Sequence, residues 1–216
     1  MTAGLITSKK RVTNHGEVFT SEREINDMLD LVKQETERID SRFLEPACGD
    51  GNFLSEILNR KLTIVMNRYG KSQKELDKYS LVAITSIYGI ELLKDNTQRC
   101  RKRLFEIYLD WYRSVTQLQN NKQLLNCVKF VLKLNIIRGD ALTLKTVGDV
   151  EEPIVFSEWS FSKNMVKRRC FSFDELLKNQ SIRGTLLFSD FGDDVFLPKT
   201  VEEFPLVHYL ELANNV

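Results

Sequence analysis

The turn at Gly49-Asp50-Gly51 constrains the fold more than any other feature of this sequence. It follows a short apolar run, Phe43-Leu44, and comes just before apolar residues at helical spacing, Phe53, Leu54, Ile57 and Leu58. This order predicts a strand, a tight turn and the N-terminus of a helix. Glycine permits a positive φ and lets a ligand approach the backbone. The N–H groups and positive dipole end of such a helix suit a carboxylate or phosphate.

Apolar periodicity predicts helices that alternate with strands along the chain. The expected helices start at Thr20 or Ser21 and run to about Ile39, continue from the glycine turn to about Asn67, and cover 95–117, 124–134 and 173–178. The expected strands are 42–46, 81–90 ending at Glu91, 135–137, 153–156 and 185–188. Such alternation implies parallel pairing through right-handed crossovers. We therefore expect one doubly wound α/β domain with a mostly parallel sheet.

The bulk properties are those of a soluble globular chain. Its 216 residues carry 31 Lys and Arg against 30 Asp and Glu, so charge alone argues neither for nor against a nucleic-acid partner. Four scattered cysteines and two histidines predict no zinc site. The first eleven residues lack the apolar core of a signal peptide, and no apolar run is long enough for a membrane span. The expected location is cytoplasmic.

Acidic residues lie at the carboxyl ends of two of the predicted strands. In an open parallel sheet, ligands bind at the carboxyl ends of the strands. Glu91 follows Tyr88-Gly89-Ile90, and a carboxylate there can accept from both hydroxyls of a ribose. Asp140 follows Arg138-Gly139. The alternatives are a solvated glutamate at a strand end and an ordinary turn aspartate.

The segment Glu45-Pro46-Ala47-Cys48-Gly49-Asp50-Gly51-Asn52-Phe53-Leu54 resembles the first motif of class I S-adenosylmethionine-dependent methyltransferases. It is most similar to the version in bacterial DNA adenine-N6 methyltransferases of restriction–modification systems. The resemblance implies a Rossmann-like fold, S-adenosylmethionine as cofactor, and DNA as partner. Glu91 resembles the family's ribose-binding acid, and Asp140 the aspartate that meets the adenine amine. The implied cofactor-binding residues are Glu45, Pro46, Ala47, Cys48, Gly49, Gly51, Phe53, Glu91, Leu92, Asp140 and Ala141.

Upstream, Gly16-Glu17-Val18-Phe19-Thr20 resembles the motif that precedes the glycine loop in the adenine-N6 group. The resemblance implies that Phe19 lines the adenine pocket and that Thr20 binds the methionine carboxylate. The family usually has proline after the threonine, where this chain has Ser21. The alternative is a plain helix N-cap. Residues 1–20 are thus expected to form an N-terminal segment with a cofactor-proximal motif, and residues 21–216 a single methyltransferase-like domain.

The chain departs from the family at the catalytic motif, a tetrapeptide with two consecutive prolines after the fourth strand. Ser157, Glu158 and Trp159 stand at the expected place, and both prolines are missing. Ser157 matches the first position, the Glu158 carboxylate could accept the amine hydrogens, and Trp159 or Phe161 could stack on a flipped base. A salt bridge for Glu158 and packing against the sheet for Trp159 are the alternatives.

No separate DNA-recognition domain is expected, and the C-terminal part is acidic. Lys167-Arg168-Arg169 forms a basic cluster after the catalytic position, where it could bind phosphates or simply be solvated. The expected function is an S-adenosylmethionine-dependent methyltransferase, with DNA adenine as acceptor, no metal, and a specificity or nuclease subunit as partner. The chain could be the catalytic part of a larger protein or one subunit of an assembly. The alternatives are a catalytically silent S-adenosylmethionine-binding subunit or sensor, and a methyltransferase acting on RNA or protein.

Overall fold

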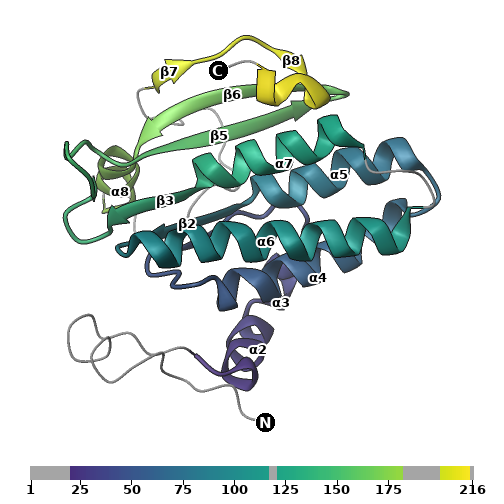
Figure 1. The fold of residues 1–216 in the computed structure, drawn as a ribbon, viewed down its shortest axis with the longest axis horizontal. Helices are drawn as coiled ribbons and strands as arrows, with labels where there is room; N and C mark the ends of the chain where they lie inside the picture. Colours follow the sequence, from purple (N-terminus) through teal and green to yellow (C-terminus); the bar gives the residue numbers. More distant parts are fainter. Residues whose placement is uncertain (1–19, 117–120, 182–199, 215–216) are drawn as a thin grey trace.

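The computed structural model describes residues 20–116, 121–181 and 200–214 (Figure 1). Its first sheet has four strands in the order β1-β2-β3-β4. Phe43 pairs with Ile87, and Gly89 with Ile136, so β1, β2 and β3 run parallel, whereas β4 is antiparallel. The fold is therefore mixed α/β with a mostly parallel sheet. The strands are β1 (Phe43–Glu45), β2 (Ile87–Glu91), β3 (Ile136–Asp140) and β4 (Lys145–Thr146).

Two helices connect each successive pair of parallel strands. Each of these helices packs against two others: α4 contacts α5 and α6, and α7 contacts α5 and α6. Strand β2 contacts all four helices, and every one of its residues is buried. Figure 1 shows the helices stacked beside β2 and β3. They are α4 (Asn52–Tyr69), α5 (Gln73–Thr85), α6 (Lys94–Val115) and α7 (Lys122–Asn135).

The second sheet is antiparallel and has the order β5-β6-β7, with β8 also paired to β6. Ser162 pairs with Met165, so Lys163 and Asn164 form a two-residue hairpin loop. Lys163 has a φ of 52°, as such turns require. The elements of this part are β5 (Val155–Ser162), β6 (Met165–Ser172), α8 (Phe173–Ser181), β7 (Thr200–Glu203), β8 (Val207–His208) and the 3₁₀ helix η1 (Tyr209–Asn214).

This second sheet corrects the prediction for the C-terminal third of the chain. The strand expected over 153–156 extends to Ser162 and pairs antiparallel with β6 instead of joining the parallel sheet. Its partner strand follows after only two residues, so the hairpin closes with little loss of chain entropy. Helices and strands therefore do not alternate throughout. The strand expected over 185–188 lies outside the described residues.

A second correction concerns residues 81–84, which were expected to be extended and are the end of α5. The buried residues Leu76, Ser80, Leu81 and Ile84 repeat at helical rather than alternating spacing. Ser72 caps the helix by accepting from the Glu75 N–H. The charged residues before position 80 thus belong to the helix that the apolar residues complete.

The expected N-terminal helix is present as two pieces, α2 (Glu22–Leu31) and α3 (Lys33–Thr36). Ser21 is the N-cap of α2 and forms a capping box with Glu24, which confirms one of the two predicted caps. Helix α2 packs on α4, where Arg60 forms an ion pair with Asp30 at 2.7 Å. None of the helices in the described parts combines the length and apolar character that a membrane crossing needs.

Lys61 fixes the start of β1 from inside the core. Its side chain on α4 is completely buried, and its ammonium donates hydrogen bonds to the carbonyls of Arg38, Ile39 and Ser41 at 3.0, 3.0 and 2.5 Å. The same ammonium lies 5.2 Å from the centre of the Phe43 ring. Three backbone acceptors offset part of the cost of burying the charge. The chain before β1 is thereby tied to the helix that follows the glycine turn.

Candidate cofactor-binding site

The glycine loop, residues 46–51, joins the carboxyl end of β1 to the N-terminus of α4. Gly49 has a φ of 55° and Gly51 a φ of 94°, which confirms the predicted left-handed conformations. The Gly51 N–H donates to the Cys48 carbonyl at 2.9 Å and closes a tight turn. The Gly51 carbonyl then accepts from the Ser55 N–H at 2.8 Å. The helix N-terminus therefore opens directly from the loop.

Close packing also requires glycine around this loop. A Cβ atom on Gly51 would lie 2.8 Å from the Sγ atom of Cys100 on α6. A Cβ atom on Gly89 of β2 would lie 2.8 Å from the Cys48 Sγ. The Cys100 thiol and burial together raise the pKa of the Cys48 thiol far above its usual range. Cys48 is therefore a packing residue with a protonated thiol rather than a nucleophile.

Glu91 joins the glycine loop to the end of β2. Its carboxylate is buried and accepts hydrogen bonds from the Gly49 N–H at 2.9 Å and the Leu93 N–H at 2.8 Å. The Cys48 N–H also donates to the Ile90 carbonyl at 2.9 Å. A carboxylate has about four acceptor positions, so two remain for the hydroxyls of a ligand. The position of Glu91 in the sequence does not by itself reveal its contact with the Gly49 N–H.

Glu45 ends the neighbouring strand β1, where it pairs with Gly89. Its side chain is half-buried, and this burial raises the pKa of the carboxyl, while a hydrogen bond from the Ala47 N–H acts in the opposite direction. Pro46 and Ala47 are exposed, and Phe53 on the first turn of α4 is partly buried. Glu45 thus stands at the entrance of the loop, with a half-buried carboxylate for which a cation is a favourable partner.

Asp140 ends β3, the third parallel strand. Its Oδ1 accepts from the Leu142 N–H at 2.8 Å, in the turn geometry that the alternative interpretation predicted. Ala141 is partly buried, and Leu142 is 94% exposed. Leu92, after β2, is 45% exposed, and its carbonyl accepts from the Arg138 Nε at 3.5 Å. An apolar surface therefore lies beside the carboxylates at this edge.

The three acids form a staggered row rather than a cluster. Glu45 is level with Gly89, two residues before Glu91, and Glu91 is level with Arg138, two residues before Asp140. With strands about 4.8 Å apart and a rise of about 3.3 Å per residue, the row spans on the order of 15 Å. Within the described residues, no group of three or more His, Cys, Asp or Glu side chains could hold a metal ion. The row suits an elongated ligand with polar groups at several points.

Arg103 of α6 is a functional candidate that sequence reasoning missed. Its guanidinium forms an ion pair with Asp50 in the glycine loop at 2.7 Å and hydrogen bonds to Asn52. The Asp50 side chain is only 13% exposed. Because the two residues lie 53 positions apart, only the fold brings them together. The sequence signal that could have pointed to this contact was Asp50 itself, a loop aspartate to which no ligand had been assigned.

The upstream motif is only partly described. Phe19 lies outside the described residues. Thr20 is exposed and comes directly before the Ser21 N-cap of α2. No hydrogen bond joins Thr20 to the glycine loop in the described part of the chain, so its role toward a cofactor stays a prediction.

The proposed catalytic residues do not reach the glycine loop. Strand β5 starts near the carboxyl end of β3, where a Cβ on Gly139 would lie 2.7 Å from Ile154. Further along β5, Trp159 Nε1 donates to the Asn135 side chain at 3.1 Å, and Asn135 directly precedes β3. Glu158 pairs with Arg42, which directly precedes β1, at 3.0 Å. The expected position at the end of a parallel strand is therefore wrong, and these residues approach the amino ends.

Each of the three side chains has protein partners at that edge. The Ser157 Oγ accepts from the Arg168 Nε at 3.0 Å. The Glu158 carboxylate accepts from Arg169 at 2.7 Å as well as from Arg42. Trp159 is 6% exposed. The ion-pair and packing alternatives describe these contacts, and a catalytic role for the three residues stays a prediction.

Searches against known protein families, curated proteins and solved structures return no match.

Proposed function

We propose that this chain binds S-adenosylmethionine along the carboxyl edge of its parallel sheet and serves methyl transfer to adenine N6 in DNA. The observation that carries the proposal is the Glu91 carboxylate bonded to the Gly49 N–H, which joins the glycine loop and the end of β2 into one site. The motif resemblance and the mostly parallel sheet support a Rossmann-like class I methyltransferase fold.

The staggered acids match the ligand in length and charge. The amino-acid end would lie at the glycine loop, with its ammonium near Glu45 and its carboxylate toward the α4 N-terminus. The ribose hydroxyls would donate to Glu91, and the adenine amine to Asp140, with Leu92, Ala141 and Leu142 beside the ring. S-adenosylmethionine also carries a sulfonium cation, and a row of carboxylates favours such a cation over a neutral analogue.

The reaction would be an in-line displacement at the methyl carbon. The methyl–sulfur bond breaks as a bond to the acceptor nitrogen forms, the sulfur leaves as a neutral thioether, and the nitrogen releases a proton. Catalysis of this kind depends mainly on positioning the two reactants. A partner subunit would supply target recognition.

A second candidate is a catalytically silent S-adenosylmethionine-binding subunit. The specific observation in its favour is that Ser157, Glu158 and Trp159 are held at the amino ends of the strands by Arg168, Arg42, Arg169 and Asn135. The cofactor site would then act as a sensor or as a structural element of an assembly.

Calorimetry with S-adenosylmethionine and its demethylated product tests the shared premise. We expect binding of both compounds, and Glu45→Ala should weaken it by about tenfold or more, equivalent to about 1.4 kcal/mol. Glu106→Gln, an exposed change on α6, is the matched control. Absence of binding by the wild-type protein would refute the proposal.

Transfer of a tritiated methyl group separates the two candidates. DNA, RNA and protein acceptors are tested with and without cell extract. Label in DNA supports the methyltransferase, and label only in RNA or protein changes its substrate. Tight cofactor binding without labelling of any acceptor supports the silent subunit.

A further inference from the structure

The positive charge of this protein is concentrated on one helical hairpin. Residues 94–135, which contain α6 and α7, carry nine Lys and Arg and only three Asp and Glu, whereas the whole chain has 31 and 30. The near-neutral net charge therefore conceals a strongly basic segment. Such local fields attract polyanions independently of the overall charge.

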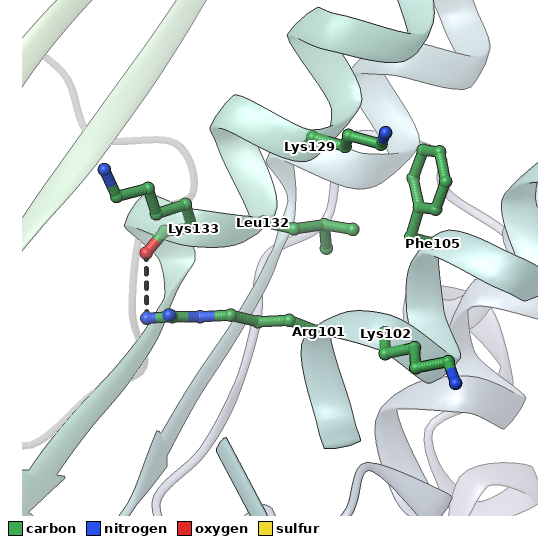
Figure 2. A pocket seen from close by; sticks show the side chains of 6 residues that line it. All are labelled: Arg101, Lys102, Phe105, Lys129, Leu132 and Lys133. Atoms are coloured by element: carbon green, nitrogen blue, oxygen red, sulfur yellow. Dashed lines mark hydrogen bonds between the residues drawn. The ribbon is translucent and has the colours of Figure 1, made fainter. Parts of the chain in front are cut away.

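The basic side chains surround a groove between the two helices, with a volume of about 240 Å³. Figure 2 shows the groove lined by Arg101 and Lys102 of α6 and by Lys129 and Lys133 of α7. Phe105 and Leu132 form its apolar part. Two pairs of cations thus flank an apolar strip.

The lysines of α7 are not neutralised within the protein. In the described parts of the chain, no carboxylate lies within 4.0 Å of the Lys129 or Lys133 ammonium. Lys129 lies 4.7 Å from the centre of the Phe105 ring. Like charges four residues apart on a helix destabilise it by a few tenths of a kcal/mol. An external anion would relieve this repulsion.

Arg101 is held in place beside them. Its Nε donates to the Ile136 carbonyl at 2.9 Å, and its Nη2 donates to the Lys133 carbonyl at 3.1 Å. These bonds satisfy the last carbonyls of α7 and the start of β3, and they fix the guanidinium at the groove. The same helix α6 carries Arg103, the partner of Asp50 in the glycine loop. The groove and the candidate cofactor site therefore share one rigid element.

Within the groove Lys102 pairs with the exposed Glu106 at 3.7 Å, whereas all three cations of the basic cluster 167–169 have partners, unlike the two lysines of α7. Lys167 pairs with Glu203 at 2.6 Å, and Arg169 pairs with Glu158 at 2.7 Å. The Arg168 guanidinium lies 4.0 Å from the centre of the Phe204 ring. Of these two basic clusters, the α6–α7 groove is the better candidate for binding phosphates.

We propose that the α6–α7 groove binds the phosphate backbone of double-stranded DNA. Lysines and arginines neutralise successive phosphates, and the sugars between them pack on the partly exposed Phe105. Such contacts hold the duplex without reading its sequence, which leaves target choice to a partner. This proposal rests on the proposed function in one respect, since DNA is the substrate that it names.

The test is binding of a fluorescein-labelled duplex of about 20 base pairs and mixed sequence, followed by anisotropy over a range of salt concentrations. Lys129→Ala/Lys133→Ala should weaken binding about tenfold or more at low salt. It should also reduce the slope of log K against log salt by about 2, since each lost phosphate contact removes about 0.9. The matched control is Lys74→Ala/Lys78→Ala, two lysines four apart on α5, one of which also lies over an aromatic ring.

Calorimetry with S-adenosylmethionine on the same proteins separates the two proposals. Cofactor binding without DNA binding, or an equal loss in both lysine pairs, overturns the groove proposal and leaves the cofactor site intact. DNA binding that depends on Lys129 and Lys133, without cofactor binding, supports the groove and refutes the proposed function. Stronger binding to single-stranded RNA of equal length also overturns the assignment to DNA.

Discussion

The Glu91 carboxylate accepts a hydrogen bond from the Gly49 backbone N–H at 2.9 Å, across 42 residues of sequence. This bond holds the glycine loop against the end of β2, and a second one from Leu93 fixes the carboxylate itself. The acid thus has a structural role in the loop besides the ribose-binding role that we propose. Both roles need two acceptor oxygens, so one substitution tests them together.

Glu91→Gln should weaken binding of S-adenosylmethionine by about tenfold or more. The glutamine amide has one acceptor oxygen, and its NH₂ group would face either the Gly49 or the Leu93 N–H, donor against donor. The free energy of unfolding should fall by about 1–3 kcal/mol, since a hydrogen-bonded buried carboxylate is lost. Calorimetry and urea unfolding measure the two effects, with Glu106→Gln as control. Unchanged cofactor affinity despite lower stability would remove Glu91 from the ligand site.

Gly51→Ala should destabilise the protein by about 2 kcal/mol or more. A φ of 94° is costly for alanine, and the new Cβ would lie 2.8 Å from the Cys100 Sγ. Urea unfolding measures the loss. Gly148→Ala is the control, because the nearest atom to a Cβ there is 3.9 Å away and no positive φ occurs. A loss no larger than the control's would show that the loop can shift away from α6.

The conformation of the glycine loop was predictable because it is encoded locally. The glycines at positions 49 and 51 indicate a positive φ at their own positions, and the apolar spacing after them predicts helix α4. Ser21 and Glu24 likewise define a cap within four residues. The end of β2 at Glu91 was also found, since an apolar run stops there.

The contacts that complete the candidate site were not predictable, because they depend on topology. Arg103 meets Asp50 only once α6 packs on α4, and Glu91 meets Gly49 only once β1 and β2 pair. The β5–β6 hairpin was missed for a different reason. The positive φ of its loop falls on Lys163, a residue type that is not a usual hairpin signal, and the family's fourth strand was expected there instead.

Glu158→Ala should lower the free energy of unfolding by about 1–3 kcal/mol and leave the affinity for S-adenosylmethionine unchanged. The side chain is 19% exposed and pairs with Arg42 and Arg169, so its removal leaves two partly buried guanidinium groups without a carboxylate. Urea unfolding and calorimetry check both statements, with the exposed Glu202→Ala as control.

Methyl-transfer assays decide whether Glu158 takes part in the reaction. If the wild-type protein labels an acceptor and Glu158→Gln does not, while stability and cofactor affinity stay normal, the residue takes part in the reaction. In that case the amino ends of the strands would have to belong to the acceptor site.

Lys61 makes a pH dependence of stability testable. Burial lowers the pKa of its ammonium to about 7, well below that of an exposed lysine, while nearby Asp40 and Glu35 act in the opposite direction. Between the folded and unfolded pKa values the unfolded chain binds more protons, so stability should rise with pH in this window. Below the folded pKa both states are protonated, and the penalty for burying the charge is present in full.

We therefore expect the unfolding free energy of the wild-type protein, measured relative to Lys61→Met, to increase from about pH 7 to pH 9, with a limiting slope of about 1.4 kcal/mol per pH unit. Lys61→Met should be less stable overall, since the Arg38, Ile39 and Ser41 carbonyls lose their common donor. Lys74→Met, on the exposed side of α5, should follow the wild-type pH profile. A difference between wild type and Lys61→Met that stays constant with pH would mean that the three carbonyls stabilise the ammonium enough to keep its pKa near that of an exposed lysine. The Lys61 side chain, which holds the chain before β1, would then be charged at every pH in the range.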